Sequence, residues 1–221
     1  MKNPGKRSKQ PTDIRQGSLV EAVLRLAAQR SPADITTGDL AQAVGITQGA
    51  VFRHFASKEA IWLAALDWTT DTLMTRLQAA ASAAPSPLAA LQAVFKAHVD
   101  FVAAHPGVPR VIFQELQQAQ DTALKLRVRS LMQQYRALLT GLLQRANDQR
   151  LLAPGTDLQA AAVLFIGSVQ GLVMQSLISG QASAMAAQAP GVFTIYLRGL
   201  AVKNDQTAAS NPIEPVLKET P

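Results

Sequence analysis

The fold of this chain is decided by one stretch, TTGDLAQAVGITQGAVFRHFASK, at residues 36–58. The stretch predicts two short helices joined by a tight turn, followed by the start of a third. Thr36 can cap the first helix together with Asp39, three residues later. Gly45 ends this helix where a left-handed residue is needed. We therefore expect a helix-turn-helix unit here.

The second helix of the stretch presents small, polar and cationic side chains to solvent. Thr47 can cap this helix, and Val51 and Phe55 form its buried face. The residues expected to point outward are Gln48, Gly49, Ala50, Phe52, Arg53 and His54. A short helix with such a face fits the major groove of DNA.

The composition favours helices packed on helices. Of the 221 residues, 48% are hydrophobic, and alanine and leucine dominate. Since there are no cysteines, disulfides and thiolate metal sites are excluded. The basic N-terminus lacks an apolar signal segment, so we expect a cytoplasmic protein. The net charge of +6 permits binding to nucleic acid without requiring it.

Apolar periodicity and chain breaks predict an all-α fold of about nine helices. Besides the two above, helices are expected at residues 13–30, 57–81, 87–104, 109–118, 121–149, 158–179 and 190–202. The pattern indicates a small three-helix head followed by a larger helical body.

Four segments follow from this pattern. We expect a disordered basic arm at 1–12, a helix-turn-helix domain at 13–67, a helical body at 68–202 and a disordered tail at 203–221. The arm either keeps the protein soluble or lies on DNA phosphates.

The helix at 158–179 is strongly apolar and contains Gly167-x-x-x-Gly171. Its uninterrupted apolar run is shorter than the ~20 residues that a bilayer requires, so we expect no membrane span. We expect it to pack partly on its own domain and partly on a second subunit, completing a four-helix bundle with residues 190–202. The predicted homodimer interface consists of Leu164, Gly167, Ser168, Gly171, Val192, Phe193, Tyr196 and Leu200.

Residues 14 to about 66 resemble the DNA-binding head of the TetR/AcrR transcriptional regulators. The motif that carries this resemblance is TxxDLAxxVGITxGAVFxHFxSKE, at residues 36–59. It implies a ligand-responsive one-component regulator of the repressor type. Such a protein binds a pseudo-palindromic DNA operator as a dimer and is released by a small hydrophobic effector. The following body is then the ligand-binding and dimerisation domain.

The resemblance also implies DNA contacts at particular residues. Gln48 would read a purine edge, and Ala50 would place its methyl group on a thymine methyl. Phe52 stands where the family usually has Tyr, so a hydroxyl contact to phosphate is absent. The full predicted set is Thr36, Thr37, Thr47, Gln48, Gly49, Ala50, Phe52, Arg53, His54 and Lys58.

The effector pocket is expected among the helices between residues 57 and 179. Candidate lining residues are Trp68, Phe95, His98, Phe101, Phe113, Gln117, Met132, Tyr135, Phe165 and Met174. This mixture favours a hydrophobic, neutral or weakly anionic effector over a cationic one.

No metal or cofactor is predicted. His98 and His105 lie seven residues apart with acidic residues nearby, a set that a metal sensor could use, but a structural role is commoner. Two other classes stay open, a helical enzyme with an unrecognised site and a protein-binding adaptor. The sequence has no Gly-x-Ser-x-Gly elbow, phosphate loop or His-Glu-x-x-His motif, so an enzyme is not expected.

Overall fold

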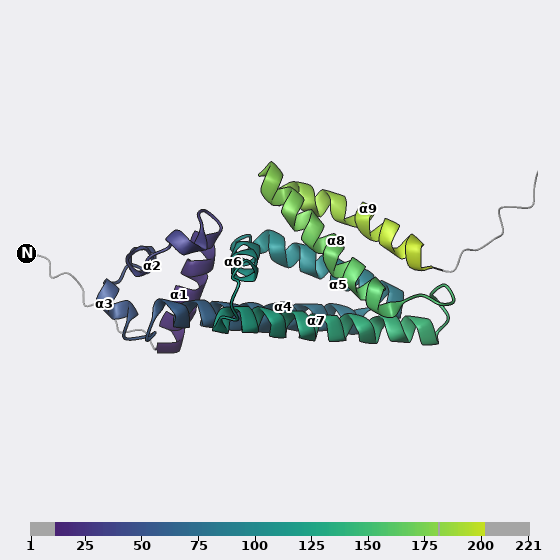
Figure 1. The fold of residues 1–221 in the computed structure, drawn as a ribbon, viewed down its shortest axis with the longest axis horizontal. Coiled ribbons are helices and arrows are strands. Elements are labelled where there is room, and N and C mark those ends of the chain that lie inside the picture. The colour runs from purple at the N-terminus through teal and green to yellow at the C-terminus, as the bar shows by residue number, and fades with distance from the viewer. Residues whose placement is uncertain (1–11, 181, 202–221) are drawn as a thin grey trace, which may run out of the picture.

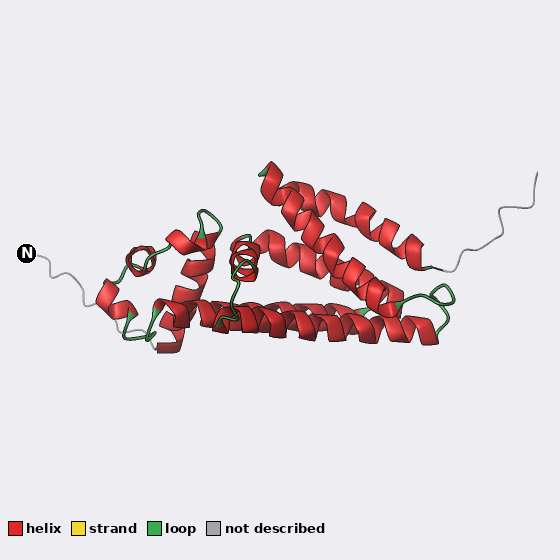
Figure 2. Cartoon of the chain, viewed as in Figure 1, coloured by secondary structure: helices red, strands yellow, loops and turns green. Residues whose placement is uncertain are grey.

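The computed structural model describes residues 12–180 and 182–201. Within these residues the chain forms nine α-helices and one short 3-10 helix, which confirms the all-α prediction (Figure 2). The elements are α1 (Thr12–Ala27), η1 (Pro32–Asp34), α2 (Thr37–Val44), α3 (Gln48–Val51), α4 (Lys58–Ala83), α5 (Pro87–Ala104), α6 (Gly107–Leu116), α7 (Ala123–Asp148), α8 (Leu158–Ser179) and α9 (Ala182–Leu200). Residues 1–11 of the expected basic arm and the whole expected tail lie outside the described residues.

The molecule is elongated, with the head of α1, α2 and α3 at one end (Figure 1). Helices α4 and α7, each of 26 residues, run side by side along the body for about 39 Å. Helix α4 begins in the head and continues past residue 67 without a break, so the head and body share one helix. The short helix α6 lies between the head and the remaining body helices.

The capping residues of the head adopt the predicted roles. The Thr36 hydroxyl accepts a hydrogen bond from the Asp39 N–H at 3.1 Å, and the Asp39 carboxylate accepts one from the Thr36 N–H at 2.7 Å. Bonds from the Thr36 hydroxyl and N–H, followed by the Arg30 guanidinium 2.9 Å away, hold the pKa of Asp39 well below its usual range. Gly45 takes a φ of 68°, the left-handed conformation expected of it.

Helix α9 begins earlier than the sequence indicated. It starts at Ala182 rather than at residue 190, and Pro190 lies inside it. A proline inside a helix removes one backbone hydrogen bond, which is why the sequence pattern predicted it at the helix start. Met185 and Ala189, both buried, pack the additional turns against the body, which offsets the loss.

An aromatic cluster occupies the centre of the body. The rings of Phe95 and Phe165 lie 5.3 Å apart, as do those of Phe95 and Phe193, and Tyr196 lies 5.5 Å from Phe165. Phe193, Tyr196 and Leu200 are at most 7% exposed within their own chain. This corrects the sequence assignment, because these three side chains fill the core and are not presented to a second subunit.

Candidate DNA-binding surface and effector pocket

Helix α3 presents an exposed face at the end of the head. Gln48, Gly49, Phe52 and Arg53 are exposed, Phe52 with 47% of its surface. Ala50, predicted to point outward, is half-buried. The helix is one turn long. It is followed by a tighter turn, in which the N–H of Arg53 donates to the carbonyl of Ala50, three residues earlier. The recognition helix is therefore shorter than the sequence predicted.

The starts of α2 and α3 are tied together at this surface. The Gln48 Nε2 donates to the Thr37 Oγ1 at 2.7 Å, which brings two predicted DNA-contacting groups side by side. The neighbouring Thr36 hydroxyl is already engaged by Asp39 in the cap. The Thr47 hydroxyl, exposed, accepts from the Ala50 N–H at 3.3 Å. Of these three threonines, Thr37 is the one whose hydroxyl contacts Gln48.

Contacts with α1 and η1 hold the other end of this surface. The Gln16 Nε2 of α1 donates to the carbonyl of His54 at 2.8 Å. The Lys58 Nζ, predicted as a phosphate contact, donates to the carbonyl of Ala33 at 3.3 Å. Sequence reasoning missed Gln16, because it lies 38 residues from its partner and outside the motif.

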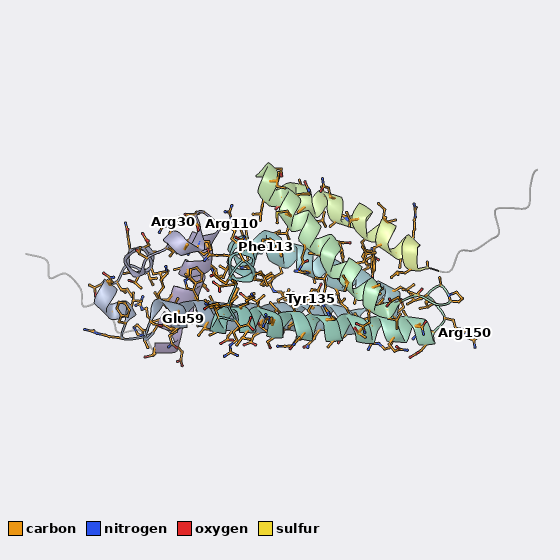
Figure 3. All side chains as sticks on the ribbon, viewed as in Figure 1. Arg30, Glu59, Arg110, Phe113, Tyr135 and Arg150 are labelled. Carbon is orange, nitrogen blue, oxygen red and sulfur yellow. The ribbon has the colours of Figure 1, made fainter. Side chains whose placement is uncertain are left out.

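An apolar cavity of about 50 Å³ lies in the body. Helices α4 to α8 line it, through Leu73, His98, Phe101, Val102, Val108, Pro109, Ile112, Phe113, Leu131, Met132, Ile166, Val169, Gln170 and Val173. His98, Phe101, Phe113 and Met132 were among the residues predicted for the pocket. Figure 3 shows Phe113 on α6 near the head and Tyr135 farther along α7.

His98, a lining residue, forms a hydrogen-bonded pair with Tyr135, which was predicted for the pocket but is not part of this lining. The His98 Nδ1 lies 3.0 Å from the Tyr135 Oη. Burial lowers the pKa of His98 to about 4, and burial also raises the pKa of Tyr135 above its usual value. Both groups are therefore uncharged at pH 7, and the cavity lining carries no charge.

Several residues predicted for the pocket lie elsewhere. Trp68 packs edge-on against His105, with ring centres 5.1 Å apart, while Phe95 and Phe165 belong to the aromatic cluster. Gln117 is exposed at the end of α6, and Met174 is 43% exposed on α8. Helical periodicity gives the face of a residue on its own helix but not the helix that covers this face, so the sequence could not show which of these residues line this cavity.

A second hollow, of about 400 Å³, lies between α5 and α9. It is lined by Ala89, Gln92, Ala93, Phe95, Lys96, Val99, Asp100, Ala186, Ala189, Pro190 and Phe193. Although it is larger, it touches no residue of α6 or of the head. Among the described residues, no group of three or more His, Asp or Glu side chains could hold a metal ion.

Helix α6 joins the smaller cavity to the head. Its first residue, Gly107, lies so close to α1 that a Cβ atom there would be 2.0 Å from the Leu24 carbonyl oxygen. Farther along α6, the Gln114 Oε1 accepts from the Ala33 N–H of η1 at 3.1 Å. Val108, Ile112 and Phe113, between these two points, line the cavity.

Helix α8 is long and apolar enough to cross a bilayer, and 39% of its most apolar window is buried in the chain. The core helix of a soluble protein meets the same criteria. Its outer face exposes Val163 and Leu164, each at 56%, together with Gly167 and Gly171. Among the described side chains of α9, the large apolar one that is exposed is Ile195, at 73%.

Comparison with known protein families covers both parts of the chain. Residues 19–65 match the family described as bacterial regulatory proteins, tetR family. Residues 87–190 match the tetracyclin repressor-like C-terminal domain. The chain belongs to the TetR family. As a TetR-family regulator it is a DNA-binding protein of transcription control and not an enzyme.

Individual proteins resemble the chain over most of its length. The nucleoid occlusion factor SlmA of Marinomonas sp. (strain MWYL1) is 21% identical over 159 residues, which are 72% of this chain and 81% of SlmA. The fatty acid degradation regulator FadR from Bacillus halodurans has a TM-score of 0.75 at 19% identity, covering 87% of this chain and 98% of that one. FadR from Bacillus subtilis, solved with stearoyl-CoA, has a TM-score of 0.73 at 17% identity, covering 83% and 98%. These structures share the fold of this chain.

Proposed function

We propose that this TetR-family regulator is a repressor that binds a pseudo-palindromic operator as a homodimer and is released by a small hydrophobic effector in the cytoplasm. The observation that carries this proposal is that α6 contacts both the cavity and the head. Its middle lines an apolar cavity, and its two ends contact the head through Leu24 and Ala33. A ligand in the cavity therefore acts on the same helix that positions the DNA-binding surface.

DNA is read by the exposed face of α3 and the start of α2. Gln48 accepts and donates hydrogen bonds at a base edge, with Thr37 beside it, and Arg53 and Lys58 neutralise phosphates. Exposed Phe52 packs on a sugar or a thymine methyl. One such surface gives weak selectivity, so two copies related by a two-fold axis are needed to read an operator.

A second copy of the chain covers the outer face of α8 and α9. This face combines exposed aliphatic side chains at Leu164 and Ile195 with Gly167 and Gly171, which let helix backbones approach closely. The predicted interface residue Ser168 is half-buried, and its hydroxyl bonds to its own helix at the carbonyl of Leu164. An apolar area of this kind on two long helices fits a lasting homodimer better than free exposure to water.

The size of the cavity suggests how an effector acts. At about 50 Å³ it is far smaller than the ~300–1,000 Å³ of sites for drug-sized ligands. An effector must therefore push its walls apart, and α6 is the shortest wall helix. The chain then has two states, one with α6 in its present position and one with α6 displaced by the ligand. The ligand lowers DNA affinity by the difference between its binding free energies for these two states. The stearoyl-CoA bound to the structurally similar FadR supports an apolar effector.

The test is fluorescence anisotropy of the full chain on the intergenic DNA beside its own gene, at physiological salt with excess non-specific competitor. We expect saturable binding that survives the competitor. Gln48→Ala should reduce discrimination between operator and mutated operator by about 5- to 150-fold, and Arg53→Ala should weaken binding to all sequences. Gln133→Ala, exposed on α7, is the matched control. Binding that disappears with competitor, or a Gln48→Ala protein that discriminates like the parent, would contradict the proposal.

A further inference from the structure

The hydrogen bond between His98 and Tyr135 determines what the cavity offers a ligand. Tyr135 is 0% exposed, so water cannot reach its hydroxyl group. Among the described residues, the hydroxyl has one hydrogen-bond partner, the His98 Nδ1 at 3.0 Å. If the hydroxyl accepted this bond, its own proton would be buried without an acceptor. Tyr135 therefore donates, and Nδ1 accepts.

This direction places the imidazole proton of His98 on the other nitrogen. A neutral imidazole has one N–H donor and one acceptor, so Nδ1 as acceptor leaves Nε2 as the N–H donor. Nε2 has no hydrogen-bond partner among the described residues and is not one of their buried unpaired atoms, and the side chain lines the cavity. The ring remains neutral at pH 7, since burial holds its pKa at about 4. The cavity thus contains a free donor that does not change charge near neutral pH.

The rest of the lining contains no charge. Besides His98, the one polar lining residue is Gln170, which is exposed and therefore lies where the cavity opens. The nearby carboxylate of Asp100 is exposed and paired with Lys96 at 2.6 Å, outside this lining. The Arg76 guanidinium lies 5.6 Å from the centre of the Phe101 ring, but Arg76 is exposed and is not a lining residue. A carboxylate or ammonium group entering the cavity would therefore lose its water without meeting an opposite charge from the lining.

We propose that the part of the effector that enters the cavity is uncharged and carries a hydrogen-bond acceptor, such as a ketone or ester carbonyl, that accepts from the His98 Nε2–H. This inference rests on the proposed function, because it takes the cavity as the effector site. The hydrocarbon portion lies against Phe101, Ile112 and Phe113. Any charged portion of a longer effector stays outside, beyond Gln170.

The tautomer can be tested without a ligand. The chain has three histidines, so a long-range ¹H–¹⁵N NMR spectrum of histidine-labelled protein shows three ring systems. His98→Phe identifies the signals of residue 98. We expect a neutral ring protonated at Nε2 at pH 7. A ring protonated at Nδ1, or an imidazolium, would overturn the inference.

The ligand class can be tested with three probes of eleven carbons: 2-undecanone, undecanoate and undecylammonium. Binding is followed through the His98 Nε2 signal and through release of operator DNA. We expect the ketone to bind about tenfold more tightly than either ion. Equal or tighter binding of an ion, or no binding of any of the three, would refute the inference.

Two variants separate the hydrogen bond from simple packing. His98→Phe removes the donor and keeps an aromatic ring, while Tyr135→Phe removes the hydroxyl that fixes the tautomer. Each should reduce the preference for the ketone about tenfold, whereas Gln133→Ala should leave it unchanged. Retention of the preference in both variants would rule out a donor role for His98. Operator affinity is also measured without any probe, for the parent and for each variant. If the parent does not bind operator DNA, the repressor proposal fails, whereas the inference about His98 is judged separately by the NMR experiment.

Discussion

Replacement of Gly107 by alanine tests whether α6 joins the head to the body. A Cβ atom at this position would lie 2.0 Å from the carbonyl oxygen of Leu24 and 2.9 Å from the backbone nitrogen of Ala28. Even a close contact between carbon and oxygen requires ~3.3 Å. The opposing atoms are backbone and cannot rotate away, so α6 and α1 must separate by about 1.3 Å.

The size of the effect follows from this separation. Overpacking of a tight contact costs about 1–3 kcal/mol. For a chain of this length, that lowers the melting temperature by roughly 2–12 °C. The displaced α6 should also change operator affinity, because its contacts with Leu24 and Ala33 position the head. Calorimetry measures the first effect, and fluorescence anisotropy on operator DNA measures the second.

Gly17→Ala is the matched control, since a Cβ atom added to this helical glycine of α1 would meet no neighbouring atom within 4 Å. It should stabilise the protein by about 0.5–1 kcal/mol, because alanine is the better helix former. If Gly107→Ala melts at or above the temperature of the parent and binds the operator with unchanged affinity, the α6–α1 contact does not constrain the head. The proposed route from cavity to DNA would then be wrong.

Three further predictions concern stability and assembly. The pKa of His98 is about 4 in the folded protein and 6.5 ordinarily, so between these pH values the unfolded state binds more protons. The free energy of unfolding should therefore be highest above pH 6.5 and fall by at most about 3 kcal/mol toward pH 4. Urea unfolding of the His98→Phe variant should show a smaller fall over the same pH range. Gly45→Ala forces a side chain into a φ of 68° and should cost about 1 kcal/mol, or roughly 2–4 °C in melting temperature, by calorimetry; an unchanged melting temperature would contradict it. Leu164→Glu places a charge on the exposed face of α8 and should shift the protein from dimer to monomer in sedimentation analysis. The control variant Gln144→Glu on α7 should remain a dimer. A parent protein that sediments as a monomer would refute the proposed dimer interface.

The head was predicted well because its determinants are local. The capping pair Thr36 and Asp39, the left-handed Gly45 and the cap Thr47 each act within a few residues, so their spacing is visible in the sequence. The family motif added the expected position of the recognition helix. The predicted helix was too long, because tightening of the chain after Val51 has no distinct residue signature.

The body was predicted less well because its determinants connect distant segments. The contact of Gly107 with Leu24 and the bond from Ala33 to Gln114 join residues about eighty positions apart, and nothing in either segment alone indicates the other. On α9, periodicity correctly grouped Phe193 and Tyr196 on one buried face. It could not show that this face is covered by α5 and α8 of the same chain. Which helix covers a face is a property of the tertiary arrangement.

The two contacts at Ala33 have a consequence for how such a regulator can change over time. Both use main-chain atoms: its N–H donates to Gln114 and its carbonyl accepts from Lys58. Almost any side chain at position 33 would preserve them, and proline alone would delete the N–H. Residue 33 can therefore change during evolution without loss of the hydrogen bond that attaches the head to α6. The strength of that attachment is adjusted from outside the segment, at residues 58 and 114.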